Sequence, residues 1–378
     1  MTNVNMNPNH SQATAQSATP FLEVKDAACH FKVKRGWSQK QTLTLKAVDG
    51  VSFTVYPSET LAVVGESGCG KSSLANLIVG LNPLTSGEIS VLGHTLSNIS
   101  RSNMLSIRKD LQMVFQDPFS SLNPRMTIGA LLQEPLQVHK IGNAQQRAAR
   151  VNELLSLVNL PHSYAQRYPH QLSGGQRQRI GIARALAVEP KLIVCDEPVS
   201  SLDVSVQAQI INLLLDLQRN LGLSYVFIAH NLSVVKHIAD RVAVMYLGRI
   251  VEMTTKEALF AQPRHPYTQM LLSSVPRSHP EDPHGHVDAD SDLPSPLNVP
   301  SGCRFHTRCP YAQPRCETED PQLLDDGQDH QTACHFWPDI LASSKQAVRE
   351  IPAREKPAYV TQLLESFDEM AQQTTSDN

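Results

Sequence analysis

The 378-residue sequence lacks several features that mark common protein classes. Its apolar runs, such as LAVV and INLLLDL, are far shorter than the roughly 20 residues that a membrane-spanning helix needs. Basic residues are not in excess, since 33 Lys and Arg stand against 36 Asp and Glu, for a net charge of −3. The chain therefore has no basic surplus for holding a phosphate backbone, and we expect no nucleic-acid partner.

The first twenty residues, MTNVNMNPNHSQATAQSATP, have neither a positively charged start nor an apolar stretch. A secretion signal requires both. We therefore expect a cytoplasmic location, where structural disulfides are rare. Disulfides then do not explain why four of the seven cysteines lie between residues 302 and 335.

Between Phe21 and about Ser274, short apolar runs alternate with longer segments of helical periodicity. Nearly continuous apolar runs are typical of buried strands. Strands that alternate with helices predict an α/β fold, a mostly parallel sheet with helices on both faces. Residues 44–56 alternate more strictly and predict an additional antiparallel sheet. The expected strands are 59–65, 111–116, 191–198, 223–230 and 241–248, and the expected helices are 71–81, 144–158, 175–188 and 204–220.

Composition divides the chain into five segments. Residues 1–20 are polar and predicted to be disordered, and residues 21–275 form the main domain. Residues 276–300, rich in Pro, Asp and His, predict a linker. Residues 301–337 form a small cysteine-rich extension, and residues 338–378 a polar tail to which we assign no function.

The stretch VVGESGCGKSS ends a predicted strand, opens a predicted helix, and matches G-x-x-x-x-G-K-[ST] at Gly65–Ser72. Glycines at this spacing turn backbone amides inward to form a nest for phosphates. Lys71 is placed to reach the β- and γ-phosphates, and the Ser72 hydroxyl to bind Mg²⁺. The flanking strand and helix favour an ATP and Mg²⁺ site over a chance glycine-rich turn. The expected nucleotide contacts are Gly65, Glu66, Ser67, Gly68, Cys69, Gly70, Lys71, Ser72 and Ser73.

A second motif, KLIVCDEP, carries Asp196 and Glu197 to the end of a predicted buried strand. We expect Asp196 to hold Mg²⁺ through water and Glu197 to orient and polarise the attacking water. Adjacent strand residues point to opposite faces, so one carboxylate can serve the metal and the other the nucleophile. The alternative, a pair that only caps a helix, is disfavoured by the phosphate loop upstream.

The third motif, LSGGQRQRIGIARAL at Leu172–Leu186, places two glycines at the start of a helix, where exposed backbone amides form a second anion site. One chain has little use for two γ-phosphate sites unless two chains meet face to face. The motif resembles the signature of ATP-binding cassette (ABC) ATPases, which implies that it closes onto ATP held by an opposing subunit. The residues concerned are Ser173, Gly174, Gly175 and Gln176.

Further residues stand in the order that this family shows. The resemblance assigns Gln116 to the loop that senses Mg²⁺ and water, Asp203 to the loop that crosses the dimer seam, and His230 to the γ-phosphate and the attacking water. With Glu197, Gln116 and His230 complete the expected catalytic set. The resemblance also places Phe31 against the adenine ring, and simple core packing is a competing explanation for that residue.

Longer strings narrow the branch of the family. LKAVDGVSF, VFQDPFSSLNPRMTIG and QPRHPYTQMLL resemble ATP-binding subunits of bacterial dipeptide and oligopeptide importers, over roughly residues 21–337. The resemblance implies ATP hydrolysis that drives peptide uptake, at the cytoplasmic face of the inner membrane. The implied partners are a paralogous ATPase subunit in a heterodimer, two transmembrane permeases that dock near Gln116 to Arg125, and an external substrate-binding protein. The alternatives are a related cargo (a nickel complex, glutathione or an antimicrobial peptide) or a soluble ABC regulator.

Cys303, Cys309, Cys316 and Cys334 have the spacing C-x₅-C-x₆-C-x₁₇-C. Structural zinc sites use tighter pairs of cysteines, so wide gaps suit a larger iron–sulfur cluster better. Free buried cysteines are the other possibility, but a polar, loop-rich stretch of this kind needs a crosslink, such as a bound metal, to be compact. The importer family places a [4Fe–4S] cluster in this region, and the resemblance implies these four ligands, with Zn²⁺ as the alternative.

Overall fold

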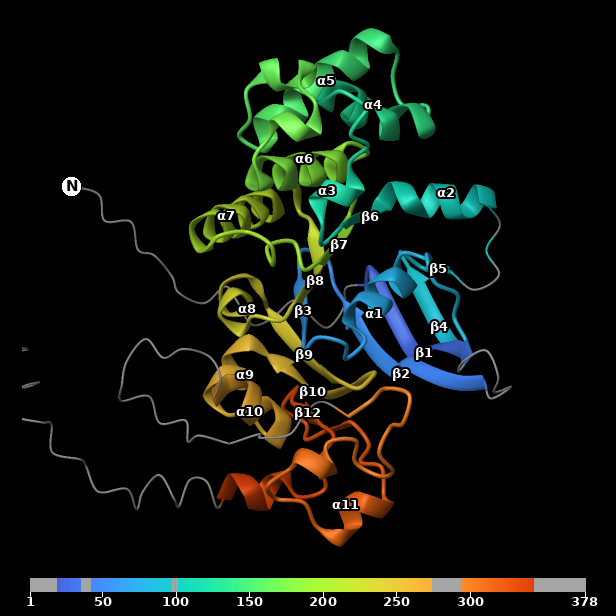
Figure 1. Cartoon of the computed structure of the whole chain (residues 1–378), viewed down its shortest axis with the longest axis vertical. Helices are drawn as coiled ribbons and strands as arrows, with labels where there is room; N and C mark the ends of the chain where they lie inside the picture. Colours follow the sequence, from blue (N-terminus) through green and yellow to red (C-terminus); the bar gives the residue numbers. More distant parts are fainter. Residues whose placement is uncertain (1–18, 35–41, 97–98, 100, 274–293, 343–378) are drawn as a thin grey trace, which may run out of the picture. The chain divides into compact units, whose positions relative to one another are not determined.

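Figure 1 shows the computed structural model, which describes residues 19–34, 42–96, 99, 101–273 and 294–342. The chain divides into two compact units, Met1–His335 and Phe336–Asn378. In the second unit, residues 337–342 are helical. The predicted disordered N-terminus, most of the predicted linker and most of the predicted tail lie outside the described residues.

The main sheet of the first unit has the strand order β11-β12-β10-β9-β3-β8-β7-β6. Five strands run parallel, β3 (Thr60–Val64), β6 (Leu111–Val114), β7 (Leu192–Asp196), β8 (Ser224–Ala229) and β9 (Arg241–Tyr246). Antiparallel pairing extends the edge beyond β9 through β10 (Arg249–Thr255), β12 (Gln331–Thr332) and β11 (Leu324–Asp325). The predicted α/β fold with a mostly parallel sheet is confirmed.

Side chains of the central strands alternate between two hydrophobic cores, one on each face of the main sheet. Val63 belongs to one core and Val64 to the other. The core that contains Val63 also receives α1 (Lys71–Ile78), while the opposite core receives α7 (Val204–Leu221) and α8 (Leu232–Ile238). Burial on both faces explains why these strands are almost wholly apolar in sequence.

A second, antiparallel sheet has the order β2-β1-β4-β5. It confirms the sheet predicted from residues 44–56, and it packs on the core that contains Val63. Its strands are β1 (Leu22–Lys34), β2 (Thr42–Val55), β4 (Ser86–Val91) and β5 (His94–Thr95).

A helical layer contributes to the core that contains Val64, through side chains such as Leu131, Leu154 and Ile180. Figure 1 draws α4, α5 and α6 together in green. The helices on either side of β6, between β5 and β7, are α2 (Arg101–Asp110), α3 (Pro118–Ser121), α4 (Ile128–Val138), α5 (Ala144–Leu157), η1 (His162–Gln166), η2 (Pro169–Gln171) and α6 (Gly174–Leu186). Of these, α2 contributes Ile107 to the core that contains Val63 instead.

The segment that follows β10 does not form a body of its own within the first unit. It comprises α9 (Lys256–Ala261), α10 (Pro266–Ser273), η3 (His306–Arg308) and α11 (Pro314–Thr318), besides β11 and β12. Phe305 is almost completely buried, and its ring lies 5.3 Å from Tyr246 and 5.4 Å from Tyr267, centroid to centroid. Part of the predicted cysteine-rich extension is therefore continuous with the main core.

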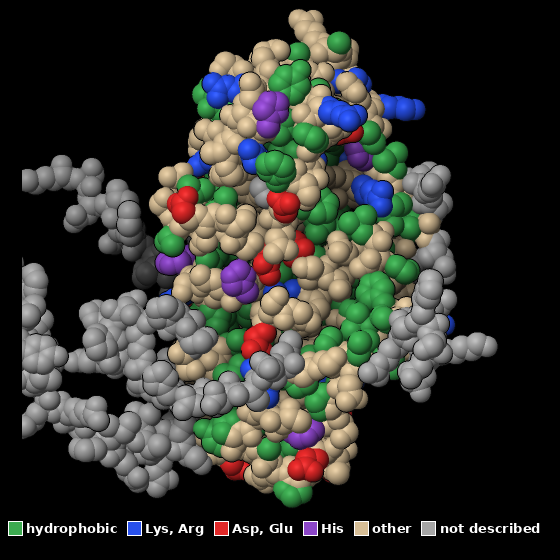
Figure 2. Space-filling view, in the orientation of Figure 1, with side chains coloured by type: hydrophobic (Ala, Val, Ile, Leu, Met, Phe, Trp, Pro, Cys, Tyr) green, Lys and Arg blue, Asp and Glu red, His purple; other side chains and the backbone are tan. Residues whose placement is uncertain are grey.

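Two surface properties bear on the classes of partner considered above. In the part of the chain that the structure describes, no helix is long and apolar enough to cross a membrane. On the face shown in Figure 2, Lys and Arg side chains are interspersed with apolar, polar and acidic ones.

Candidate active site

The phosphate loop connects β3 to α1, as the sequence predicts. Its glycines are required by close backbone contacts as much as by conformation. Gly70 has a φ of 112°, and a Cβ atom there would lie 2.1 Å from the carbonyl oxygen of Ala47. A Cβ atom on Gly65 would lie 2.2 Å from the carbonyl oxygen of Met245. Any larger residue at either position would push the loop away from its supports.

Lys71 is buried at the start of α1 and spans the loop. Its Nζ donates to the carbonyl oxygens of Gly65 at 2.8 Å and Glu66 at 2.9 Å. The same atom lies 3.9 Å from Oε1 of Glu197. A fixed positive charge thus stands between the phosphate loop and the end of β7, where an anionic group is best stabilised.

The end of β7 carries a carboxylate that faces the loop. Ser72 Oγ donates a hydrogen bond to Asp196 Oδ1 at 3.1 Å. Burial raises the pKa of Asp196, the Ser72 hydrogen bond opposes that shift, and the charge of Glu197 adds to it. A hydroxyl and a carboxylate oxygen side by side are the hard oxygen donors that Mg²⁺ prefers. The residues present therefore fit a magnesium ion.

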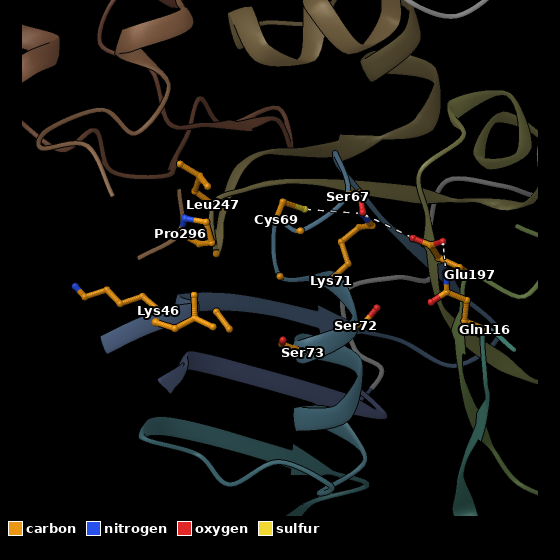
Figure 3. Close-up of a pocket in the computed structure, with 15 residues that line it drawn as sticks. Lys46, Ser67, Cys69, Lys71, Ser72, Ser73, Gln116, Glu197, Leu247 and Pro296 are labelled. Atoms are coloured by element: carbon orange, nitrogen blue, oxygen red, sulfur yellow. Dashed lines mark hydrogen bonds and ion pairs between the residues drawn. The ribbon is translucent and has the colours of Figure 1, made fainter. Parts of the chain in front are cut away.

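Polar side chains converge on the carboxylate of Glu197, and Figure 3 shows two of them, Lys71 and Gln116. Gln116 Nε2 donates to Glu197 Oε2 at 3.0 Å, and His230 Nδ1 lies 3.3 Å from the same oxygen. Gln116 follows β6 and His230 follows β8, so the neighbouring ends of parallel strands supply the cluster. Glu197 itself has a φ of 43°, a conformation that non-glycine residues rarely adopt. Its backbone is thus held in an uncommon conformation at the centre of the cluster.

The loop opens into a pocket of about 250 Å³. Seven of the predicted nucleotide contacts, Ser67 to Ser73, line it together with Gln116 and Glu197. Sequence reasoning missed the remaining walls, which come from β2, the β9–β10 turn and the segment before residue 300. They are Leu45, Lys46, Ala47, Leu247, Gly248 and Pro296.

Phe31 is not among the residues that line this pocket. It pairs across the antiparallel sheet with Leu45, which does line the pocket, and packs half-buried against the core that contains Val63. The geometry agrees with the core-packing explanation weighed for this residue. Its role toward adenine stays a prediction.

The signature residues lie away from the pocket of their own chain. Ser173 caps α6 in a reciprocal arrangement with Gln176, and both Ser173 and Gly174 are exposed. Gly175 must be glycine, since a Cβ atom there would lie 2.5 Å from Val206 Cγ1. Asp203 caps α7 and is also exposed. None of these residues lines the pocket around Lys71.

The four clustered cysteines approach one another without forming a metal site. The Cys303 N–H donates to the carbonyl oxygen of Cys316 at 2.8 Å. Burial, together with the charges of Cys334, Cys303 and Cys316, raises the pKa of Cys309 to about 12. Among the described residues, no group of three or more His, Cys, Asp or Glu side chains is arranged to hold a metal ion.

Comparison with protein families gives two matches. Residues 48–200 match the model of the ABC transporter family, and residues 251–316 match the family described as oligopeptide/dipeptide transporter, C-terminal region. The second match begins at β10, earlier than the cysteine-rich extension predicted from residue 301.

Several curated proteins are similar along nearly their whole length. The oligopeptide transport ATP-binding protein AppF of Bacillus subtilis is 49% identical over 86% of this chain and 99% of its own. OppF of Escherichia coli, also an oligopeptide transport ATP-binding protein, is 50% identical over 85% of this chain and 98% of its own. The dipeptide transport ATP-binding protein DppF of Escherichia coli is 48% identical over 84% of this chain and 94% of its own.

Among solved structures, a dimeric ATP-binding cassette in a post-hydrolysis state, bound to ADP and Pi, superposes with a TM-score of 0.55. It is 28% identical and covers 62% of this chain and 98% of its own. Fold and site thus define an ATP-binding subunit of an ABC transporter. Within that class, the chain belongs to the family of oligopeptide and dipeptide transport ATP-binding proteins.

Proposed function

We propose that this chain is the ATP-hydrolysing subunit of a bacterial importer that couples ATP binding and hydrolysis to the uptake of dipeptides and oligopeptides. One observation carries the proposal: Gln116, His230 and Lys71 converge on Glu197 beside the phosphate loop. The names of the relatives supply the transport context, since AppF, OppF and DppF are peptide transport ATP-binding proteins.

Each side chain then has a role in hydrolysis. The amides of residues 65–73 and the Lys71 ammonium hold the β- and γ-phosphates. Glu197 accepts a hydrogen bond from the attacking water and polarises it, and Gln116 and His230 orient that carboxylate and the γ-phosphate. Ser72 and Asp196 would hold Mg²⁺, with Gln116 nearby, and the ion supplies charge neutralisation of the phosphates. Phe31 would lie against the adenine ring.

The exposed signature suggests that a second subunit completes the reaction. We propose that Ser173, Gly174, Gly175 and Gln176 reach the nucleotide of a paralogous ATPase subunit in a heterodimer, and that Asp203 lies at the seam. The exposure of Ser173, Gly174 and Asp203, and the separation of all five residues from the pocket of this chain, support this arrangement. ATP binding would favour the closed dimer, and hydrolysis with phosphate release would reopen it.

The remaining partners would be two transmembrane permeases and an external substrate-binding protein. Residues 116–125 would dock a permease, so that the chain sits peripherally on the cytoplasmic face of the inner membrane. Residues 21–275 would be the ATPase domain and residues 301–337 the C-terminal region of this importer family. A nickel complex, glutathione or an antimicrobial peptide is the alternative cargo.

Peptide uptake in a strain that lacks this chain tests the proposal. Expression of the chain should restore uptake of labelled dipeptides and oligopeptides, and Glu197→Gln should not restore it. Glu257→Gln, which changes an exposed carboxylate on α9, is the matched control and should restore uptake fully. Unimpaired peptide uptake in the deletion strain, with loss of nickel or glutathione uptake instead, would assign the alternative cargo. A chain that never co-purifies with permeases in detergent would favour the soluble regulator.

We also propose that Cys303, Cys309, Cys316 and Cys334 receive a [4Fe–4S] cluster, with Zn²⁺ as the alternative. The mutual approach of the four thiols supports this, because each of the other three is close enough to shift the pKa of Cys309. Metal binding deprotonates thiols and draws them together, so an arrangement of neutral thiols is compatible with a site that forms on loading. Four irons and four sulfides per anaerobically purified chain would support the cluster, and one zinc would support the alternative. A metal-free chain would refute both.

A further inference from the structure

Two residues from the C-terminal part of the chain, Tyr267 and Arg308, form hydrogen bonds with Glu66 of the phosphate loop. Arg308 donates two hydrogen bonds to the Glu66 carboxylate, Nη1 to Oε2 at 2.7 Å and Nη2 to Oε1 at 3.0 Å. The backbone N–H of Glu66 donates to Tyr267 Oη at 2.9 Å. On the inner side, the carbonyl oxygen of Glu66 accepts from Lys71 Nζ at 2.9 Å. Side chain, amide and carbonyl of this loop residue are thus all fixed.

Both outer contacts come from the part of the chain that distinguishes this family from other cassettes. Tyr267 and Arg308 lie inside residues 251–316, which match the oligopeptide/dipeptide transporter C-terminal region, and outside residues 48–200, which match the general ABC family. The contacts of Tyr267 and Arg308 with Glu66 are therefore additional to the ATPase domain that other ABC proteins share.

The two side chains that hold Glu66, those of Tyr267 and Arg308, are themselves buried and packed against aromatic rings. The Arg308 side chain is 5% exposed and Tyr267 is fully buried. The Arg308 guanidinium also lies 6.0 Å from the ring centroid of Tyr246 and 5.9 Å from that of Phe305. These rings belong to the aromatic group that joins η3 to the main core. A bidentate ion pair in such surroundings fixes the orientation of the Glu66 carboxylate as well as its distance from Arg308.

The ion pair between Arg308 and Glu66 changes the charge of the phosphate loop and so bears on nucleotide binding. Glu66 directly follows Gly65 in a loop that must accept a polyanion, and an unpaired carboxylate there opposes phosphate binding. Arg308 neutralises that carboxylate through two of its guanidinium nitrogens, Nη1 and Nη2. Removing Arg308 alone would leave the negative charge in place, whereas removing both charges would leave the loop neutral.

We propose that Arg308 is a positioning residue for ATP binding, which holds and neutralises Glu66 so that the phosphate loop accepts the triphosphate. This inference rests on the proposed nucleotide site. It predicts a specific order of ATP affinities among charge variants, and a role limited to fold stability would not produce that order.

The test measures the dissociation constant for ATP and the melting temperature of five purified full-length chains. Arg308→Gln should weaken ATP binding by about tenfold or more, as expected for an unpaired charge near the phosphates. Glu66→Gln alone leaves the Arg308 charge unpaired beside the loop and should bind ATP more tightly than the wild type, whereas the double variant Glu66→Gln/Arg308→Gln should bind ATP at least about threefold more tightly than Arg308→Gln. Arg315→Gln, which breaks an exposed pair with Glu319, is the matched control and should change nothing.

The melting temperature separates the two roles. Equal ATP affinity in Arg308→Gln and the wild type, with a lower melting temperature, would overturn the inference, and so would a double variant as weak as Arg308→Gln. If Arg308→Gln does not fold, Arg308→Lys replaces it. Lysine keeps the positive charge but cannot form two parallel hydrogen bonds with the Glu66 carboxylate. Arg308→Lys should therefore bind ATP between threefold and tenfold more weakly than the wild type, where a fivefold loss of affinity corresponds to about 1 kcal/mol. A wild-type chain that fails to bind ATP would refute the proposed nucleotide site itself.

Discussion

Ser72 and Asp196 are hydrogen-bonded, Oγ to Oδ1 at 3.1 Å, although 124 positions separate them in the sequence. The first residue lies in the first turn of α1, after the phosphate loop, and the second ends β7. Their contact places a hydroxyl and a buried carboxylate at the point where the loop meets the strand ends. On the proposed function, nucleotide and metal affinity should therefore depend on both elements together.

Loss of this pair should raise the Mg²⁺ requirement. In Ser72→Ala and Asp196→Asn we expect half-maximal ATP turnover at a Mg²⁺ concentration at least about tenfold higher than in the wild type. The first variant removes a hard oxygen donor, and the second removes the negative charge of the carboxylate. A Mg²⁺ titration of ATP turnover measures the effect. Ser90→Ala, a hydroxyl on β4 that bonds Thr95 and Glu88, is the control. An unchanged Mg²⁺ titration in both site variants would remove Ser72 and Asp196 from the metal site.

The buried imidazole of His265 predicts an acid-sensitive fold. Burial lowers the pKa of His265 from 6.5 to about 4, so the folded chain keeps the ring neutral where the unfolded chain binds a proton. Protons therefore favour the unfolded state as the pH falls from about 6.5 toward 4. The free energy of unfolding should drop over that window by roughly 2–3 kcal/mol from this group.

His265→Asn isolates that effect from other acid-sensitive groups. The Asn side chain retains an acceptor for the N–H of Tyr267, which His265 Nδ1 accepts at 3.0 Å, but it does not titrate. Melting temperatures at pH 7 and pH 5 should fall further in the wild type than in the variant. Parallel losses in the two proteins would show that His265 does not carry the acid sensitivity.

The ring of Phe305 predicts that the C-terminal segment stabilises the ATPase core. Phe305→Ala should lower the free energy of unfolding by about 3–5 kcal/mol, because it leaves a cavity between Tyr246 and Tyr267. Denaturant titration measures the loss, and Phe119→Ala is the control, since that ring is 61% exposed. A loss below about 1 kcal/mol would mean that the segment is only loosely attached.

The sequence was sufficient to predict the parts of the site that local pattern encodes. The glycine spacing of the phosphate loop and the apolar run before Asp196 each define a strand end or a helix start without reference to distant residues. The order of motifs then predicted that Gln116, Glu197 and His230 act together, and the parallel strands bring these side chains into contact.

Contacts between distant segments were not predictable in this way. Leu247 and Pro296 line the pocket, yet neither stands in a motif, because tertiary packing alone brings them to the loop. Arg308 meets Glu66 across 242 positions. The cysteine spacing predicted a metal site, but spacing does not fix how the side chains are arranged, and the described residues hold no group of three or more His, Cys, Asp or Glu side chains placed for a metal ion.

The most direct test of the account is ATP turnover by Glu197→Gln, because every side chain of the cluster is defined by its distance to that carboxylate. The chain should be assembled with the permeases and with a second ATPase subunit whose own catalytic glutamate is replaced, so that only this site can turn over. We predict that turnover falls by about 10²-fold or more while ATP affinity stays within about threefold of the wild type, with Glu257→Gln unchanged. Turnover at the wild-type rate in Glu197→Gln would contradict the account.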